Sequence, residues 1–223
     1  MKVRELLATA EVPGGEPLRL FRRDRDYMIV LDRNELMNSR MSGSEEALAE
    51  MTADRMPVAR VPHMLIGGYG MGFTLRAALA KLGADAKITV VELVPEIVDW
   101  ARDHMAGLTG GCLEDPRVEL VIDDVVNVIN ASEHAFDAIL LDVDNGPDGL
   151  TSKANGRLYS QRGLAEARSA LRPGGILAIW SAAPDPNFAR KLEGAGFDVD
   201  EVVVRARSNG KGPRHIIWFA TKT

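Results

Sequence analysis

The sequence holds a single cysteine, Cys112, in 223 residues, which excludes a disulfide within the chain. Its four histidines, His63, His104, His134 and His215, are too scattered to match the spacing of a zinc site. Apolar runs are also short: none approaches the roughly 18 residues of a membrane span. The first residues contain too short an apolar stretch for a signal peptide. We therefore expect a metal-free cytoplasmic protein without a membrane partner.

The sequence also lacks an excess of positive charge. It has 27 Lys and Arg and 32 Asp and Glu, so its net charge is -5. Nucleic-acid binding through a broad basic face needs clustered Lys and Arg, so we expect no nucleic-acid partner. The best basic run, "RLFRRDRD", is interleaved with aspartates, which favours a solvated hairpin. With 46% hydrophobic and 26% charged residues, the composition is that of a globular protein.

The first 60 residues differ in pattern from the rest. Residues 14–36 alternate short apolar runs with Asp-rich turns, which predicts one or two β-hairpins. The segment "SEEALAEMTA" predicts a short helix with Ser44 as its N-cap and acidic residues in its first turn. Pro57 and Pro62 then interrupt the chain. We expect a small hairpin and helix appendage over residues 1–60 and a main domain over 61–223.

From His63 onward, apolar runs of strand length alternate with helical patterns. Such alternation predicts right-handed crossovers and a mostly parallel sheet covered on both faces. The end differs, because "FDVDEVVVRAR" and "HIIWFAT" flank a Gly-rich turn and predict an antiparallel hairpin. The predicted fold class is α/β: a Rossmann-like, doubly wound, mostly parallel seven-stranded sheet that ends in an antiparallel hairpin.

A glycine-rich loop, "GGYGMG", connects the first strand of the main domain to a helix. Gly67, Gly68, Gly70 and Gly72 let the backbone adopt positive φ and approach a ligand, while the helix N-terminus offers amide donors. A dinucleotide loop of the G-x-G-x-x-G type would need glycine at position 73, where Phe73 stands. Taken alone, the loop is equally compatible with a tight turn that binds nothing.

Acidic residues follow the next three strands. Glu92 ends "KITVVE", where a carboxylate could accept both ribose hydroxyls. Asp123 and Asp124 follow "VELVI", and Asp142 follows "FDAILL". A lone acid at a strand end is usually just solvated, but the carboxyl ends of parallel strands meet at one edge of a sheet and form its ligand crevice. The set therefore predicts one binding crevice.

Three blocks carry a family resemblance: "DPRVELVIDDVVNVI", "FDAILLDVDNGP" and "ALRPGGILAIW". They resemble the corresponding blocks of spermidine synthases, which are aminopropyltransferases built on the class I S-adenosylmethionine-dependent methyltransferase fold. The antiparallel ending is typical of that fold. The resemblance covers roughly residues 60 to 182.

The resemblance implies that the loop glycines approach a nucleoside, that Glu92 holds its ribose and Asp124 its adenine, and that Asp142 serves as the catalytic base. In the aminopropyl transfer reading, Asp144 is a candidate partner for the acceptor's ammonium group. Tyr159 is a second candidate for acceptor binding, although a tyrosine between a strand and a helix more often packs in the core. The donor would be S-adenosylmethionine or its decarboxylated form, the acceptor a small molecule such as a polyamine, and the assembly a homodimer. The full set of residues expected to contact the donor is Gly67, Gly68, Tyr69, Gly70, Gly72, Glu92, Leu93, Asp123, Asp124, Val125 and Asp142.

The chemistry is consistent with an amine acceptor. An alkylammonium has a pKa of about 10.4, as in lysine, so it must lose a proton before it attacks, and a carboxylate can accept that proton. Residues 114–148 hold ten acids and one base, Arg117, a field that attracts a polyamine.

Three positions depart from the spermidine synthase pattern. Met71 stands where those enzymes carry an aspartate in the glycine loop, Leu36 lies near their N-terminal glutamine, and Leu164 replaces their acceptor-binding tyrosine. Three functions therefore stay open: aminopropyl transfer to an amine, methyl transfer from S-adenosylmethionine to a small acceptor, and non-catalytic nucleoside binding.

Overall fold

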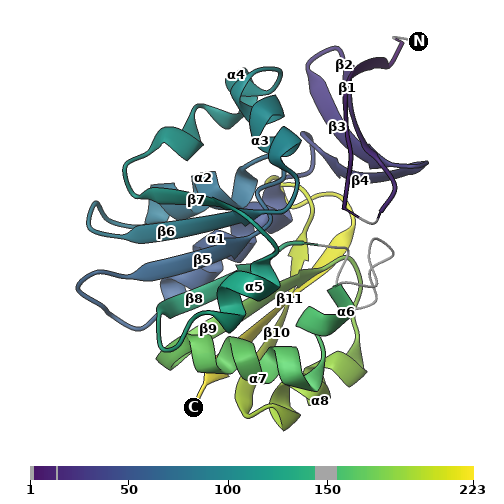
Figure 1. Ribbon diagram of the computed structural model, residues 1–223. Helices are drawn as coiled ribbons and strands as arrows, with labels where there is room; N and C mark the ends of the chain where they lie inside the picture. The colour runs from purple at the N-terminus through teal and green to yellow at the C-terminus, as the bar shows by residue number, and fades with distance from the viewer. Residues whose placement is uncertain (1–2, 14, 144–154) are drawn as a thin grey trace.

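The computed structural model describes residues 3–13, 15–143 and 155–223. They form two sheets, shown in Figure 1: a four-stranded antiparallel sheet in the order β1-β2-β3-β4, and a seven-stranded sheet in the order β10-β11-β9-β8-β5-β6-β7. The small sheet lies over one end of the large one. The mixed α/β class and the seven-stranded sheet predicted from the sequence are confirmed.

The small sheet is built by the first 38 residues. Its strands are β1 (Glu5–Ala10), β2 (Leu18–Arg23), β3 (Asp26–Leu31) and β4 (Asn34–Asn38). The predicted hairpins are confirmed, and β1 is an additional strand that the sequence pattern did not predict. Asp24 and Asp32 occupy the tight turns with φ of 63° and 50°, a region that aspartate tolerates better than most residues. Leu18, Leu20 and Ile29 are buried against the core of the large sheet.

The large sheet has five parallel strands and a terminal hairpin. β11 lies antiparallel between β9 and β10, and the other pairings are parallel. All six residues of β8 are buried, as expected for a central strand covered on both faces. The strands are β5 (His63–Gly67), β6 (Lys87–Glu92), β7 (Val118–Ile122), β8 (Phe136–Leu141), β9 (Leu171–Ser181), β10 (Phe197–Arg205) and β11 (Arg214–Lys222).

Helices cover both faces of this sheet. Alternate strand residues enter two separate cores: Ile66 and Leu140 face one, and Leu65 and Ile139 face the other. Figure 1 shows α1 and α2 behind the sheet and α5 and α7 in front of it. The helices are α1 (Gly43–Arg55), α2 (Phe73–Lys81), α3 (Pro95–Arg102), α4 (Ala106–Thr109), α5 (Val125–Asn130), α6 (Asn155–Leu158), α7 (Gln161–Ala170), α8 (Pro186–Gly194) and the 3₁₀ helix η1 (Cys112–Glu114).

The helix predicted after the hairpins is present, but its N-cap is not Ser44. The capping residue is Ser42, whose side chain makes no capping hydrogen bond, and Ser44 lies inside the first turn. The helix α1 packs against α2 and against β8, β9, β10 and β11 of the large sheet. The division of the chain between residues 60 and 61 stays a prediction.

No helix in the described part of the chain is both long enough and apolar enough to cross a membrane. Within those same residues, no group of three or more His, Cys, Asp or Glu is arranged to hold a metal ion.

Candidate functional site

A cavity of about 250 Å³ lies where the parallel strands end, and the small sheet closes its other side. The strand ends that the sequence singled out converge on it. The predicted residues that line it are Gly68 and Gly70 after β5, Glu92 at the end of β6, Leu93 after it, Asp123–Val125 after β7, and Asp142 after β8.

The glycine loop has three residues with positive φ: Gly68 at 84°, Gly70 at 55° and Gly72 at 75°. Close packing opposes a side chain at two of them. A Cβ on Gly68 would lie 2.8 Å from the backbone oxygen of Asp142, and one on Gly72 would lie 2.7 Å from the hydroxyl of Tyr69. The glycines therefore let the loop sit against the end of β8, which brings Asp142 to the cavity.

Glu92 connects the glycine loop to the end of β6. Its Oε2 accepts a hydrogen bond from the amide of Tyr69 at 2.9 Å, and its Oε1 accepts one from the amide of Val94 at 2.9 Å. The residue is 5% exposed, and burial raises the pKa of its carboxyl group. Each carboxylate oxygen can accept more than one hydrogen bond, so Glu92 can hold the loop and still bind a ligand hydroxyl.

Asp123 and Asp124 stand at the start of α5. The carboxylate of Asp124 accepts from the amide of Val126 at 2.9 Å and so caps the helix, and the guanidinium of Arg157 lies 3.5 Å away. The carboxylate of Asp123 accepts from the side-chain amide of Asn127 at 2.7 Å. Both aspartates therefore have fixed positions at the cavity wall.

Asp142 follows β8, and its amide donates to the carbonyl of Gly67 at 3.1 Å. The hydroxyl of Thr74 donates to its Oδ2 at 3.4 Å. Asp142 keeps part of its surface open to the cavity, yet the surrounding atoms bury its carboxyl group enough to raise its pKa to about 6. A carboxylate with this pKa is ionised at neutral pH and can still accept a proton readily.

Glu45, in the first turn of α1, is a site residue that the sequence did not reveal. It is 6% exposed and lines the same cavity as Asp142. Burial is the main cause that raises its pKa to about 8, and the charge of Asp142 is the second. The hydroxyl of Ser44 donates to its Oε2 at 2.6 Å. In the sequence, Glu45 is only one of two acids in a helix start, where acids are common for electrostatic reasons.

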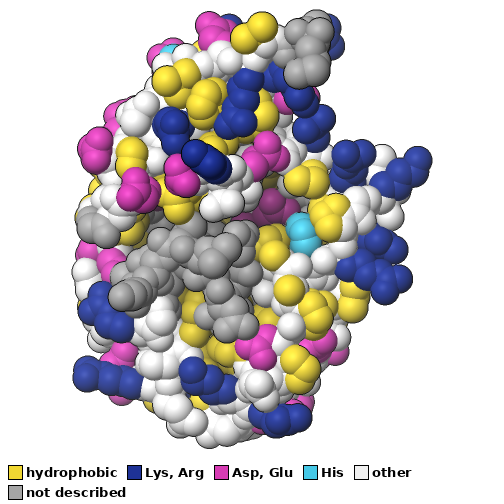
Figure 2. Space-filling model, turned by 90° about the vertical axis from the view of Figure 1, so that its right-hand side faces the viewer, with side chains coloured by type: hydrophobic (Ala, Val, Ile, Leu, Met, Phe, Trp, Pro, Cys, Tyr) yellow, Lys and Arg dark blue, Asp and Glu magenta, His cyan; other side chains and the backbone are white. Residues whose placement is uncertain are grey.

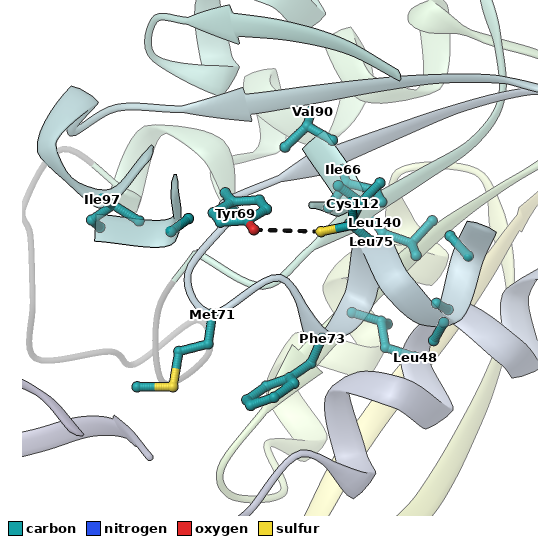
Figure 3. Packing of buried hydrophobic residues seen from close by; sticks show 14 of the residues in the cluster. Leu48, Ile66, Tyr69, Met71, Phe73, Leu75, Val90, Ile97, Cys112 and Leu140 are labelled. Carbon is teal, nitrogen blue, oxygen red and sulfur yellow. Dashed lines mark hydrogen bonds between the residues drawn. The ribbon is translucent and has the colours of Figure 1, made fainter. Parts of the chain in front are cut away.

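Tyr69 and Met71, both in the glycine loop, turn their side chains into the core. The hydroxyl of Tyr69 lies 3.4 Å from the sulfur of Cys112, as Figure 3 shows, and Met71 is fully buried in the same cluster. Neither belongs to the described lining of the cavity, and the same is true of Gly67 and Gly72. Tyr69 serves the site through its backbone amide on Glu92.

The small sheet contributes an apolar wall that includes Leu36 and Met37, and Trp180 of β9 lines the cavity as well. The indole Nε1 of Trp180 is buried, and no described residue accepts a hydrogen bond from it. Leaving a buried donor unpaired costs about 1 to 3 kcal/mol, which a ligand with an acceptor atom would recover. Figure 2 shows a recessed acidic side chain among hydrophobic ones, with a histidine beside it.

Two residues discussed for the acceptor, Tyr159 and Leu164, lie in the core. Tyr159 is buried, and its ring packs edge-on against Phe188 with centroids 5.6 Å apart. Leu164 is buried in the same core. Neither belongs to the described lining of the cavity. Asp144 lies outside the residues that the structure describes.

The model of the spermine/spermidine synthase domain matches residues 42–191. The chain belongs to the spermine/spermidine synthase family. The matched region holds the glycine loop, all the acidic residues of the cavity that follow a strand, and Glu45. The family assignment made from the three sequence blocks is thereby confirmed.

Individual relatives agree with this family. The chain is 34% identical to the polyamine aminopropyltransferase of Mycobacterium tuberculosis over 124 residues, 54% of this chain and 23% of that protein. It is 34% identical to that of Aeropyrum pernix over 114 residues, 51% of this chain and 35% of that protein. The matches thus span about a quarter to a third of these relatives. The spermidine synthase structure from Thermotoga maritima has a TM-score of 0.76 at 19% identity, covering 98% of this chain and 73% of that one, which supports the fold.

Proposed function

We propose that this protein is a transferase that moves an aminopropyl group from decarboxylated S-adenosylmethionine to an amine acceptor. The observation that carries the proposal is the composition of the cavity wall. Its charged members are all acidic, including Glu45, Glu92 and Asp142, and the described lining includes no Lys or Arg. A wall of this kind favours a ligand that is a cation and lacks a carboxylate, which fits a decarboxylated sulfonium donor beside an ammonium acceptor.

Each carboxylate has a distinct role in this proposal. Glu92 accepts hydrogen bonds from the ribose hydroxyls, and Asp123 and Asp124 face the adenine. Asp142 orients the acceptor and takes a proton from its ammonium group, because only the neutral amine has a free electron pair. That pair forms the new N–C bond, the C–S bond breaks, and methylthioadenosine leaves as a neutral thioether. The protein contributes mainly by holding nitrogen, carbon and sulfur in line.

The named relatives support the amine acceptor, since the curated proteins from Mycobacterium tuberculosis and Aeropyrum pernix are called polyamine aminopropyltransferases. One observation favours methyl transfer as a second candidate. Met71, at the position of the family's loop aspartate, is buried in the core, so the glycine loop presents no side-chain carboxylate to the amine of a decarboxylated donor.

Product analysis by mass spectrometry tests the proposal. The protein is incubated with putrescine and either S-adenosylmethionine or its decarboxylated form, with the Asp142→Asn variant as control. We expect methylthioadenosine and an aminopropylated amine from the decarboxylated donor, and neither product from the variant. A methylated amine from the intact donor would instead establish the methyltransferase. Absence of either product from a panel of amines, despite donor binding, would leave a nucleoside-binding module.

We also propose that the protein is a cytoplasmic homodimer. The strand β1 is an edge of the small sheet, and Val3 and Leu6 at this edge are exposed. Such an edge favours pairing with a second copy. The buried free thiol of Cys112 is compatible with a reducing compartment. A change from dimer to monomer on Leu6→Lys, followed by sedimentation, would support this assembly, and a monomeric unmodified protein would contradict it.

A further inference from the structure

A short chain of hydrogen bonds leads from the cavity toward the start of β11. The hydroxyl of Ser44 donates to Oε2 of Glu45 at 2.6 Å, and the same hydroxyl lies 2.9 Å from Nδ1 of His215. His215 is half-buried, and the ring of Trp180 packs edge-on against it at 4.7 Å. Three residues from two distant parts of the chain therefore join a buried carboxyl group to a partly exposed imidazole.

We propose that Glu45, Ser44 and His215 form a proton-transfer path that carries the proton of the amine acceptor out of the cavity. The inference rests on the proposed transfer to an amine and extends it. Each turnover releases one proton, which Asp142 takes from the ammonium and must pass on before the next turnover. The neighbouring carboxyl group of Glu45 is the next acceptor in the cavity. Glu45 lines the cavity beside Asp142, and the hydroxyl of Ser44 is the link from its carboxyl group to the imidazole.

The transfer is balanced atom by atom. When Glu45 carries the proton, its O–H donates to Ser44, and the hydroxyl of Ser44 donates to the free electron pair on Nδ1 of His215. Moving both protons one step along leaves Glu45 as a carboxylate and His215 as an imidazolium. The imidazolium then gives its Nε2 proton to solvent. No bond other than O–H and N–H bonds forms or breaks, and no oxidant or further reactant is needed.

The surrounding charges set the direction of the transfer. Asp142 after β8 and Glu46 on α1 both raise the pKa of Glu45, which favours its protonated form before the ligands bind. Two uncharged groups from other elements also face these residues. The hydroxyl of Thr74 on α2 contacts Asp142, and the ring of Trp180 on β9 contacts His215. A sulfonium or ammonium cation in the cavity lowers the pKa of a nearby carboxyl group. Burial lowers the pKa of His215, which opposes the transfer. A bound cation lowers the pKa of Glu45 in turn, and we expect this to move the proton toward His215 and on to solvent.

The test uses two variants with a matched control. His215→Asn keeps a side-chain amide able to donate to Ser44 but cannot carry a proton, and Ser44→Ala removes the link. Glu50→Gln changes an exposed acid on the same helix that does not belong to the described lining of the cavity. Donor affinity, measured by calorimetry, reports whether each variant is folded.

We expect both path variants to lower kcat at least about tenfold while the donor's KM stays within a few fold, with Glu50→Gln unchanged. Added imidazole should restore part of the activity of His215→Asn, which a purely structural role of the histidine would not allow. Full activity of His215→Asn would overturn the path, and this holds even if Ser44→Ala does not fold. Loss of activity in His215→Asn that imidazole does not restore would overturn it as well. Inactivity of the unmodified protein toward amines would instead refute the proposed function and, with it, this inference.

Discussion

Replacing Glu45 by glutamine should make the protein more stable at alkaline pH. An acid whose pKa is raised on folding binds its proton more tightly in the folded state than in the unfolded state. The free energy of unfolding therefore falls as the pH rises from the ordinary value of 4.5 through about 8, the pKa of Glu45 in the fold. Glutamine cannot ionise, so the variant escapes this loss and still accepts the hydrogen bond from Ser44.

The magnitude follows from the size of the displacement. Each pKa unit corresponds to about 1.4 kcal/mol, so a fully ionised Glu45 costs at most about 5 kcal/mol. The two carboxyl groups titrate together, so part of this cost belongs to Asp142 and remains in the variant only as far as Asp142 alone requires it. We expect Glu45→Gln to be about 2 to 3 kcal/mol more stable than the unmodified protein at pH 9 and within about 0.5 kcal/mol of it at pH 5.

Urea denaturation followed by circular dichroism between pH 5 and pH 9 measures this difference. Glu50→Gln serves as the control, since its side chain is exposed on the same helix and should leave the pH profile unchanged. Parallel profiles for the unmodified protein and Glu45→Gln would refute the reasoning, because they would mean that Glu45 is ionised at little cost in the fold.

Three further predictions concern the donor and the loop. Asp142→Asn should lower kcat by about 10² to 10⁴-fold, with the affinity for methylthioadenosine within a few fold in calorimetry; unchanged turnover would remove Asp142 from the mechanism. Glu92→Gln should weaken methylthioadenosine binding by about 1 to 3 kcal/mol in the same titration, whereas equal affinity would show that its charge is not used. Gly68→Ala should lower the free energy of unfolding by about 1 to 3 kcal/mol, measured by urea denaturation. The reason is that φ is 84° and that a Cβ would lie 2.8 Å from the backbone oxygen of Asp142. A neutral effect would mean that the loop relaxes freely.

The fold and the strand-end acids were predictable because their cause is local and general. Strand length, helical periodicity and the final hairpin fix the order of elements, and parallel strands bring their carboxyl ends to one edge. Glu92, Asp124 and Asp142 could therefore be placed together before any coordinates were known.

The remaining features depend on contacts between distant parts of the chain. Glu45 reaches the cavity only because α1 packs against the large sheet, and His215 meets Ser44 across 171 positions in the sequence. The direction of the Met71 side chain depends on three positive-φ glycines in one loop. The strand β1 is weakly alternating, and among the described residues it pairs with β2 alone, so its pattern gave no signal.

The central claim is that the cavity binds a cationic adenosyl donor between Glu92, Asp124 and Asp142. Calorimetric titration with decarboxylated S-adenosylmethionine, intact S-adenosylmethionine and methylthioadenosine tests it most directly. The account predicts binding of all three, tightest for the decarboxylated donor, because its charge is wholly positive and the wall is acidic. Failure of all three to bind, or tighter binding of the intact donor, would contradict it.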